Sequence, residues 1–108
     1  MQHRGGAQLI IEGTEFTNNS SSGQTVIISQ ATIYNINSSL TMSHSSFNQS
    51  GDSGIAFIGD GNSSVSNTTF TGVGGYGIYV HDWTESGFTL THYTNTYTGF
   101  GIAAISPP

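Results

Sequence analysis

Apolar residues recur at a nearly constant interval along most of the chain. The interval from Phe47 to Phe70 (70 − 47 = 23) is repeated from Phe70 to Tyr93 (93 − 70 = 23). Two further apolar columns keep this period to within one position: Met42, Val65 and Phe88, and Ile55, Ile78 and Ile102. Short strand-like pieces between Gly, Ser and Asn, repeated at this length, predict a solenoid whose coils stack on one another.

The period divides the chain into about four coils, each close to one period in length, within one domain, residues 1–108. We expect the coils at about residues 7–37, 38–62, 63–85 and 86–106. The interval from Phe16 to Phe47 (47 − 16 = 31) exceeds the period, so the first coil is longer than the others. We assign its extra length to a lateral loop at about residues 29–39, which leaves residues 26–28 as the strand of that coil.

Alternation along each strand decides which side chains point into the solenoid. Ile55 and Phe57 are expected to point inward, and Ala56 and Ile58 outward. Stacked coils lie about 4.8 Å apart, so equivalent side chains form ladders. We predict an aromatic ladder of Phe16, Phe47, Phe70 and Tyr93, and an aliphatic ladder of Val26, Ile55, Ile78 and Ile102.

The outward positions beside the aliphatic ladder are unusually apolar. They define a predicted interface of Ile27, Ala56, Ile58, Tyr79, Ala103 and Ile105. An apolar strip of this kind implies a cover, for which the lateral loop or another subunit is favoured over a sugar stacked on Tyr79. The outward column on the preceding strand is mostly polar, as a solvated face should be: Ile10, Thr41, Ser66 and Thr89.

Composition excludes several classes of partner. The chain has one basic side chain, Arg4, no lysine, six acidic side chains and a formal net charge of −5. Nucleic acid and anionic membrane are therefore poor partners. Cysteine is absent, which excludes disulfides and thiolate metal sites, and no apolar run is long enough to be a transmembrane segment. The repeat pattern starts almost at Met1 without an apolar leader, so we expect a part of a longer protein.

Residues 67–80, NTTFTGVGGYGIYV, carry a resemblance to a known family. The segment resembles the parallel β-helix repeat of the pectate-lyase-like superfamily, in which a polar, Asn-rich strand and turn lead to a Gly-Ile-hydrophobic strand. It recurs around residues 47–57 and 93–105. The resemblance implies an all-β, right-handed parallel β-helix, a scaffold that carries many activities.

The beginning of the chain carries a second resemblance. GGA at residues 5–7 and FTNN at residues 16–19 look like the repeats of polymorphic outer-membrane proteins and other surface adhesins. This implies a structural or adhesive segment at an extracellular, cell-surface or virion location. Its partners would be a polysaccharide or cell-surface glycan, together with further copies of the chain or the remainder of a parent protein.

Catalytic candidates gather after the Gly-Ile strands of the second and third coils: Asp60, His81, Asp82 and Glu85. The interval from Asp60 to Asp82 (82 − 60 = 22) is one short of the period, so their carboxylates are expected to lie close together. Two carboxylates beside a histidine suit general acid–base chemistry or a Ca²⁺ ion. The four histidines share no ligand spacing, so no other metal and no further cofactor is predicted.

Residues 76–82, YGIYVHD, resemble the Tyr-Gly-Phe/Ile-Asp-Pro-His-Glu/Asp motif of mannuronan C5-epimerases, β-helix enzymes that act on alginate. His81 and Asp82 match the motif, whereas Tyr79 stands where the family has its functional Asp and Val80 replaces the Pro. Enzymes of this kind usually neutralise acidic sugars with Arg or Lys, and only Arg4 is present. The paired Asp and Gly-His-Gly pattern of polygalacturonases is missing.

Three hypotheses follow from these patterns. The favoured one is a structural or adhesive segment that binds glycans through Tyr79, His81 and Trp83. The second is a fragment of a polysaccharide lyase, C5-epimerase or hydrolase that uses the acidic corner. The third is a self-assembly module that stacks through open solenoid ends or through the apolar strip, since end coils present unpaired strands.

Overall fold

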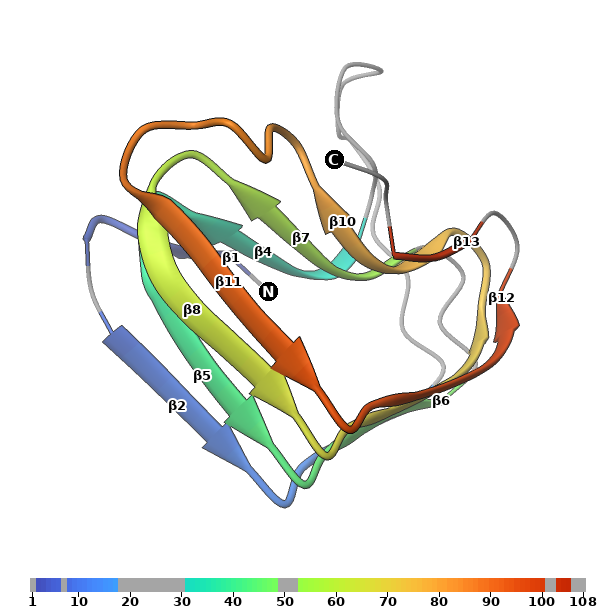
Figure 1. The fold of residues 1–108 in the computed structure, drawn as a ribbon. Coiled ribbons are helices and arrows are strands. Elements are labelled where there is room, and N and C mark those ends of the chain that lie inside the picture. Colours follow the sequence, from blue (N-terminus) through green and yellow to red (C-terminus); the bar gives the residue numbers. More distant parts are fainter. Residues whose placement is uncertain (1, 7, 18–30, 49–52, 101–102, 106–108) are drawn as a thin grey trace.

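A computed structural model of the chain describes residues 2–6, 8–17, 31–48, 53–100 and 103–105. These residues form thirteen strands, arranged in three parallel sheets that wrap around a common core (Figure 1). In each sheet, neighbouring strands come from successive coils, so the chain winds as a solenoid. The all-β parallel solenoid predicted from the repeat period is confirmed.

The first sheet has the order β1 (Gln2–Arg4), β4 (Ala31–Ile36), β7 (Ser53–Ile58), β10 (Tyr76–Val80), β13 (Ala103–Ile105). The second has the order β2 (Gln8–Glu12), β5 (Ser39–Ser43), β8 (Gly61–Ser66), β11 (Phe88–Tyr93). The third has the order β3 (Glu15–Thr17), β6 (Ser46–Asn48), β9 (Thr69–Val73), β12 (Thr96–Phe100). Each of the four coils thus contributes one strand to each sheet, and β13 is a further strand of the first sheet that follows the fourth coil.

An aromatic stack runs through the core behind the third sheet. Phe16, Phe47, Phe70 and Tyr97 follow one another with ring centroids 4.9, 4.9 and 5.1 Å apart and ring planes within 13° of parallel. The prediction of Tyr93 as the fourth ring is wrong. Tyr93 lies beside Ser66 on the second sheet and is 55% exposed, while Tyr97 lies beside Phe70.

The last coil is longer than the period, which explains that error. The interval from Phe70 to Tyr97 (97 − 70 = 27) exceeds the interval from Phe47 to Phe70 (70 − 47 = 23) by four. The extra residues lie between Val80 and Phe88, where β10 joins β11. Two other predictions fail for the same reason: Ile78 pairs with Ile105 instead of Ile102, which lies outside the described residues, and Val65 pairs with His92 instead of Phe88.

The first coil also departs from the predicted register. Residues 31–36 form β4, and Ile33 occupies the column of Ile55 and Ile78, so the prediction of a lateral loop at residues 29–39 is wrong. The extra length instead lies between β3 and β4, mostly in residues 18–30, which are outside the described part of the chain. Val26 and Ile27, the strand residues predicted for this coil, lie there too. Two apolar segments follow Phe16, and the prediction from hydropathy placed the strand of this coil in the earlier one.

The turn between the second and third sheets is the same in all four coils. Its first residue has a left-handed conformation, with φ of 64°, 50°, 48° and 59° at Gly13, His44, Asn67 and Thr94. Its second residue is polar and satisfies backbone groups: Ser45 Oγ accepts from Thr14 N–H at 3.2 Å, and Asn95 Oδ1 from Thr68 N–H at 3.0 Å. Of the three residues that are not glycine, His44 and Asn67 are of types enriched in this conformation, whereas the β-branched Thr94 rarely adopts it.

Candidate functional site

The connection between β10 and β11 carries four of the six predicted catalytic and ligand-binding residues: His81, Asp82, Trp83 and Glu85. We call residues His81–Gly87 the corner loop. The corresponding connection between β7 and β8 is only Gly59–Asp60, so the corner loop is an insertion in the repeat. Glu85 N–H donates to Asp82 O at 3.2 Å, and Phe88 N–H donates to Glu85 O at 3.1 Å. These bonds fold the insertion into a compact turn.

Asp82 is the acceptor around which this turn forms. Its Oδ1 accepts hydrogen bonds from the Thr84 hydroxyl at 2.7 Å and from Thr84 N–H at 2.9 Å. These two bonds, the hydroxyl first, lower the pKa of Asp82 from its ordinary value, and the nearby His81 lowers it further by a smaller amount. A general acid needs a raised pKa at neutral pH, so the shift runs in the opposite direction. The geometry gives Asp82 a structural role.

The other candidate acid–base residues lie around the same corner without converging on one point. His81, Asp60 and Glu85 are all exposed. Asp60 lies against Gly87, the last residue of the corner loop: a Cβ added to that glycine would be 3.4 Å from Asp60 Cβ. Within the described ranges, no group of three or more His, Asp or Glu side chains is placed to hold a metal ion. The Ca²⁺ predicted at Asp60 and Asp82 therefore has no third acidic or histidine ligand there.

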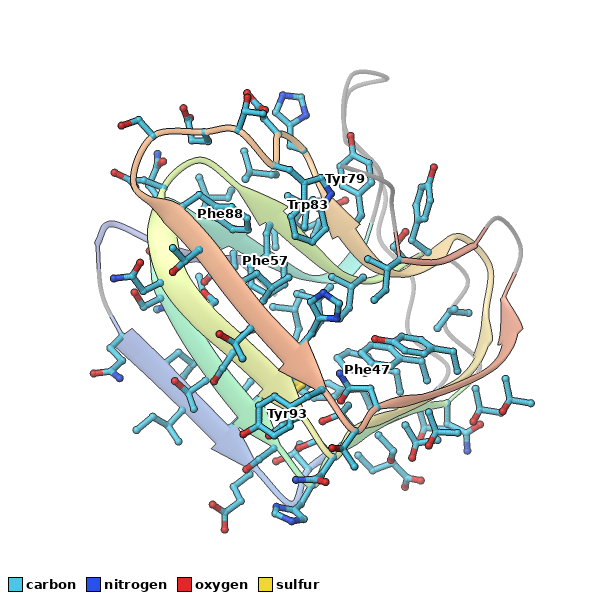
Figure 2. All side chains as sticks on the ribbon, in the orientation of Figure 1. Phe47, Phe57, Tyr79, Trp83, Phe88 and Tyr93 are labelled. Atoms are coloured by element: carbon cyan, nitrogen blue, oxygen red, sulfur yellow. The ribbon has the colours of Figure 1, made fainter. Side chains whose placement is uncertain are left out.

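Trp83, predicted to contact a ligand, turns toward the interior of the coil. Its ring meets Phe88 edge-on, with centroids 6.2 Å apart and an interplanar angle of 76°, and lies 6.2 Å from the ring of His92. Figure 2 shows Trp83 and Phe88 on the inner side of the coil, near Phe57, whereas Tyr79 points outward. Trp83 is half-buried against the core, so most of its ring is committed to packing.

The predicted apolar strip exists in part. Ala56, Ile58 and Tyr79 pack together with Tyr34 and Ile36 on the outer side of the first sheet. Tyr34 was not predicted, because β4 was placed too early in the chain. Tyr34 and Ala56 are 3% and 0% exposed, so these positions are buried and do not form an open interface.

The remaining members of the predicted interface lie elsewhere. Ile105 pairs with Ile78 in the inward column, and Ala103 pairs with Tyr76 instead of Tyr79. Ile27 lies outside the described residues. The rings of Tyr76 and Tyr79 are 5.5 Å apart, and both residues are half-buried. A sugar stacked on Tyr79 stays a prediction.

The outer face of the second sheet is mostly polar, and hydrogen bonds link three residues of one of its columns. Thr41 lies beside Ile10 and Ser64, so the predicted column is right in its first coils and wrong from Ser66 onward. The last member of this column is Thr91, which lies beside Ser64, instead of the predicted Thr89. Along the neighbouring column, Asn62 N–H donates to Ser39 Oγ at 3.2 Å, and the Thr89 hydroxyl donates to Asn62 Oδ1 at 2.7 Å. On this column, Ser39, Asn62 and Thr89 are thus linked by hydrogen bonds.

The outer face of the third sheet is also polar, but its side chains are arranged differently. We call it the hydroxyl face; it consists of two aligned columns, Glu15, Ser46, Thr69, Thr96 and Thr17, Asn48, Thr71, Thr98. These residues flank the rings of the aromatic stack on each strand. No hydrogen bond to another residue in the described ranges engages these side chains. The sequence pattern that marks this face is a polar residue on each side of a core aromatic residue. The pattern is lost in the last coil when Tyr93 is taken as the fourth ring in place of Tyr97.

A family model describing a right-handed β-helix region matches residues 2–106. The chain belongs to the right-handed β-helix family. The match covers nearly the whole chain, which confirms the fold expected from the pectate-lyase-like resemblance and gives the β-helix its hand. Comparison with curated proteins and with solved structures gives no match.

The β-helix family is defined by its architecture, so membership assigns no activity to this chain. Among the described residues there is also no helix of the length and apolar character that crosses a bilayer. The features that distinguish this β-helix are therefore local. They are the corner loop, the buried apolar strip of the first sheet and the hydroxyl face of the third.

Proposed function

We propose that this β-helix segment is a non-catalytic, adhesive element that binds neutral glycans through its hydroxyl face at an extracellular, cell or virion surface. The observation that supports this most directly is the pair of aligned Ser, Thr and Asn columns on β6, β9 and β12. Their oxygens are turned outward and have no hydrogen bond to the rest of the described chain. They are available to a partner that offers both donors and acceptors.

The chemistry of the face suits an uncharged carbohydrate. A hydroxyl both donates and accepts, and an amide does the same through two atoms, so the face matches the hydroxyl groups of a sugar. On β6, β9 and β12 the outward residues carry no charge, and Glu15 on β3 is the only charged member of the columns. Acidic glycans are disfavoured, because the chain has a net charge of −5 and a single basic side chain.

Rigidity also favours binding. The rings stacked behind the face repeat at 4.9 to 5.1 Å from centroid to centroid, and the paired strands that carry them hold the two polar columns in register. Preorganisation of this kind lowers the entropic cost of association. Because the same pair of positions recurs in each coil, a repeating glycan can make several weak contacts at once, and multivalency raises the total affinity.

The test is binding of the purified chain to a panel of neutral and acidic glycans. We expect binding to neutral glycans that weakens strongly in Thr71→Lys, which places a long charged side chain in the hydroxyl face. Thr41→Lys adds the same charge to the outer face of the second sheet and should bind like the unsubstituted chain. Binding to no glycan, or to acidic glycans alone, would overturn the proposed function, and equal effects of the two substitutions would overturn the assignment of the face.

A further inference from the structure

The hydroxyl face repeats along the axis of the solenoid at a regular interval. The aromatic rings directly behind it follow one another at 4.9, 4.9 and 5.1 Å. Its outward residues keep the same register, because Ser46 lies beside Thr69 and Thr69 lies beside Thr96. A ligand that runs along the axis therefore meets an equivalent pair of outward positions once per strand spacing, about every 4.8 Å.

The face is also nearly untwisted. Neighbouring strands of an ordinary sheet are rotated relative to one another by about 20–25°. The ring planes behind the hydroxyl face differ by only 13°, 3° and 9° from one coil to the next, which indicates that successive coils are almost translated copies of one another. A straight ligand can therefore stay over the same two columns across all four coils of the described chain.

Across the face, the two columns are separated by one inward residue. Thr69 and Thr71 flank Phe70, whose ring is completely buried. Two residues along a strand span about 6.6 Å, so the columns form parallel rows about that far apart. Backbone lies between the rows, because the side chain at the middle position points into the core. The surface is thus a flat strip with a row of polar groups along each border.

An extended β-1,4-linked glycan of the glucose or mannose type has a matching form. Its sugars are joined through equatorial bonds, so the chain is a straight, flat ribbon that advances per sugar by a length close to the strand spacing of about 4.8 Å. Hydroxyl groups lie along both edges of this ribbon, and C–H groups lie on its two faces. Along the solenoid axis, the edge hydroxyls would lie over the two polar columns and a C–H face over the backbone between them. Glycans with α-1,4 or β-1,3 linkages coil and would leave the strip after a few sugars.

We infer that the hydroxyl face takes a neutral, extended β-1,4-linked glycan that lies along the solenoid axis with one sugar on each coil. The inference rests on the proposed function and adds to it the linkage and the direction of the ligand. The direction follows from the distribution of polar groups. A glycan lying along β9 would meet only Thr69 and Thr71 of the two columns, whereas a glycan along the axis meets such a pair on every coil.

NMR titration of the purified chain with neutral hexasaccharides of different linkage tests this inference. The β-1,4-linked probes are cellohexaose, mannohexaose and chitohexaose, and the coiled probes are β-1,3-linked laminarihexaose and α-1,4-linked maltohexaose. We expect at least one β-1,4-linked probe to bind about tenfold more tightly than both coiled probes, because more of its sugars contact the face at once. For that glycan, affinity should rise from the disaccharide to the tetrasaccharide and change little beyond it, since the described face has four coils.

Lysine substitutions test the direction of the ligand. Thr98→Lys blocks the last coil and leaves three, so the tetrasaccharide should lose its advantage over the trisaccharide. Thr71→Lys blocks the third coil and divides the face, so it should weaken binding more than Thr98→Lys does. Thr41→Lys, on the outer face of the second sheet, is the matched control and should bind like the unsubstituted chain. Circular dichroism and a thermal unfolding curve establish that each variant is folded.

The outcomes distinguish this inference from the proposed function. Equal affinity for the β-1,4-linked and the coiled probes, or an affinity that does not grow beyond the disaccharide, would overturn the inference and leave the binding of neutral glycans in place. Equal effects of Thr98→Lys and Thr71→Lys on the tetrasaccharide would overturn the direction along the axis. Binding to none of the neutral probes or other neutral glycans would overturn the proposed function, and the inference with it.

Discussion

Inner and outer coils use the same columns of residues and bury them to different extents. Phe47 and Phe70 in the middle of the aromatic stack are completely buried, whereas Phe16 and Tyr97 at its ends are half-buried at nearly the same ring spacing. The difference arises because an inner ring has a layer on both sides and an outer ring on one. Equivalent positions therefore contribute unequally to stability, as expected for a solenoid governed by contacts between neighbouring repeats.

Two core columns change from apolar to polar-tipped residues in the last coil. His92 stands in the column of Val65, and Tyr97 in the column of Phe70. In the second and third coils the same columns hold Met42, Val65, Phe47 and Phe70, all fully buried. The His92 side chain is exposed, so water reaches its polar atoms, whereas the Tyr97 hydroxyl is buried.

The largest expected effect breaks the aromatic stack at an inner position. Phe70→Ala should lower the free energy of unfolding by about 3–5 kcal/mol, because a fully buried ring is replaced by a cavity. Phe16→Ala should cost roughly half as much, since its ring is already partly exposed to water. Urea unfolding followed by circular dichroism measures both. Thr71→Ala, on the outer side of the same strand as Phe70, is the control and should change stability little; equal losses at Phe16 and Phe70 would contradict the comparison.

A smaller effect is expected at the outer ring. The buried hydroxyl of Tyr97 has no hydrogen-bond partner in the described part of the chain, and its burial raises the pKa of the phenol, an effect that the neighbouring Asn95 side chain partly offsets. Tyr97→Phe should raise the free energy of unfolding by about 1 kcal/mol, because it removes an unpaired polar atom and keeps the ring. Thermal and urea unfolding report the change. Tyr93→Phe, at an exposed site, is the matched control, and a loss of stability in Tyr97→Phe would show that the hydroxyl is satisfied.

The smallest effect concerns the corner loop, which only the last coil possesses. Hydrogen bonds from Thr84 lower the pKa of Asp82, so the folded state prefers the carboxylate. The resulting stabilisation is present above the pKa of Asp82 in the unfolded chain and is lost as pH falls through the lower folded pKa. Because the side chain is exposed, we expect little change in overall stability.

Thr84→Val tests this directly. It removes the hydroxyl bond and keeps the backbone bond, so the pKa of Asp82 should move upward toward its ordinary value. A carboxyl-detected NMR titration follows that residue alone. Thr91→Val, a hydroxyl deletion on the second sheet, should leave the titration of Asp82 unchanged. A pKa in Thr84→Val equal to that of the unsubstituted chain would show that the turn does not depend on the hydroxyl.

The sequence predicted the inner coils well because no insertion interrupts them. Met42 beside Val65, Phe47 beside Phe70 and Ile55 beside Ile78 follow from the repeat period. The outer coils were predicted wrongly where insertions changed the number of residues per coil. Tyr93 and Tyr97 both follow Phe70 at intervals close to the period, and hydropathy does not report the length of a turn. Only the strand pairing after the corner loop distinguishes them.

The site was predictable as a location but not as an arrangement. That Asp60 and the corner loop share one edge followed from their position after equivalent strands. The inward turn of Trp83 and the bonding of Asp82 to Thr84 depend on the backbone path of an insertion, which the repeat does not encode. The hydroxyl face was not predicted because the ring of its fourth strand, β12, was placed at Tyr93, four residues before Tyr97 (97 − 93 = 4).

The corner loop has a practical consequence for protein engineering. The insertion at this corner leaves the stack intact, since Tyr97 still follows Phe70 at 5.1 Å. The number of residues at this corner can therefore change without changing the spacing of the stacked rings. We expect a foreign peptide inserted between Thr84 and Gly87 to project from the side of the β-helix at the level of the last coil. The fold can thus serve as a scaffold that displays a peptide epitope at a chosen coil.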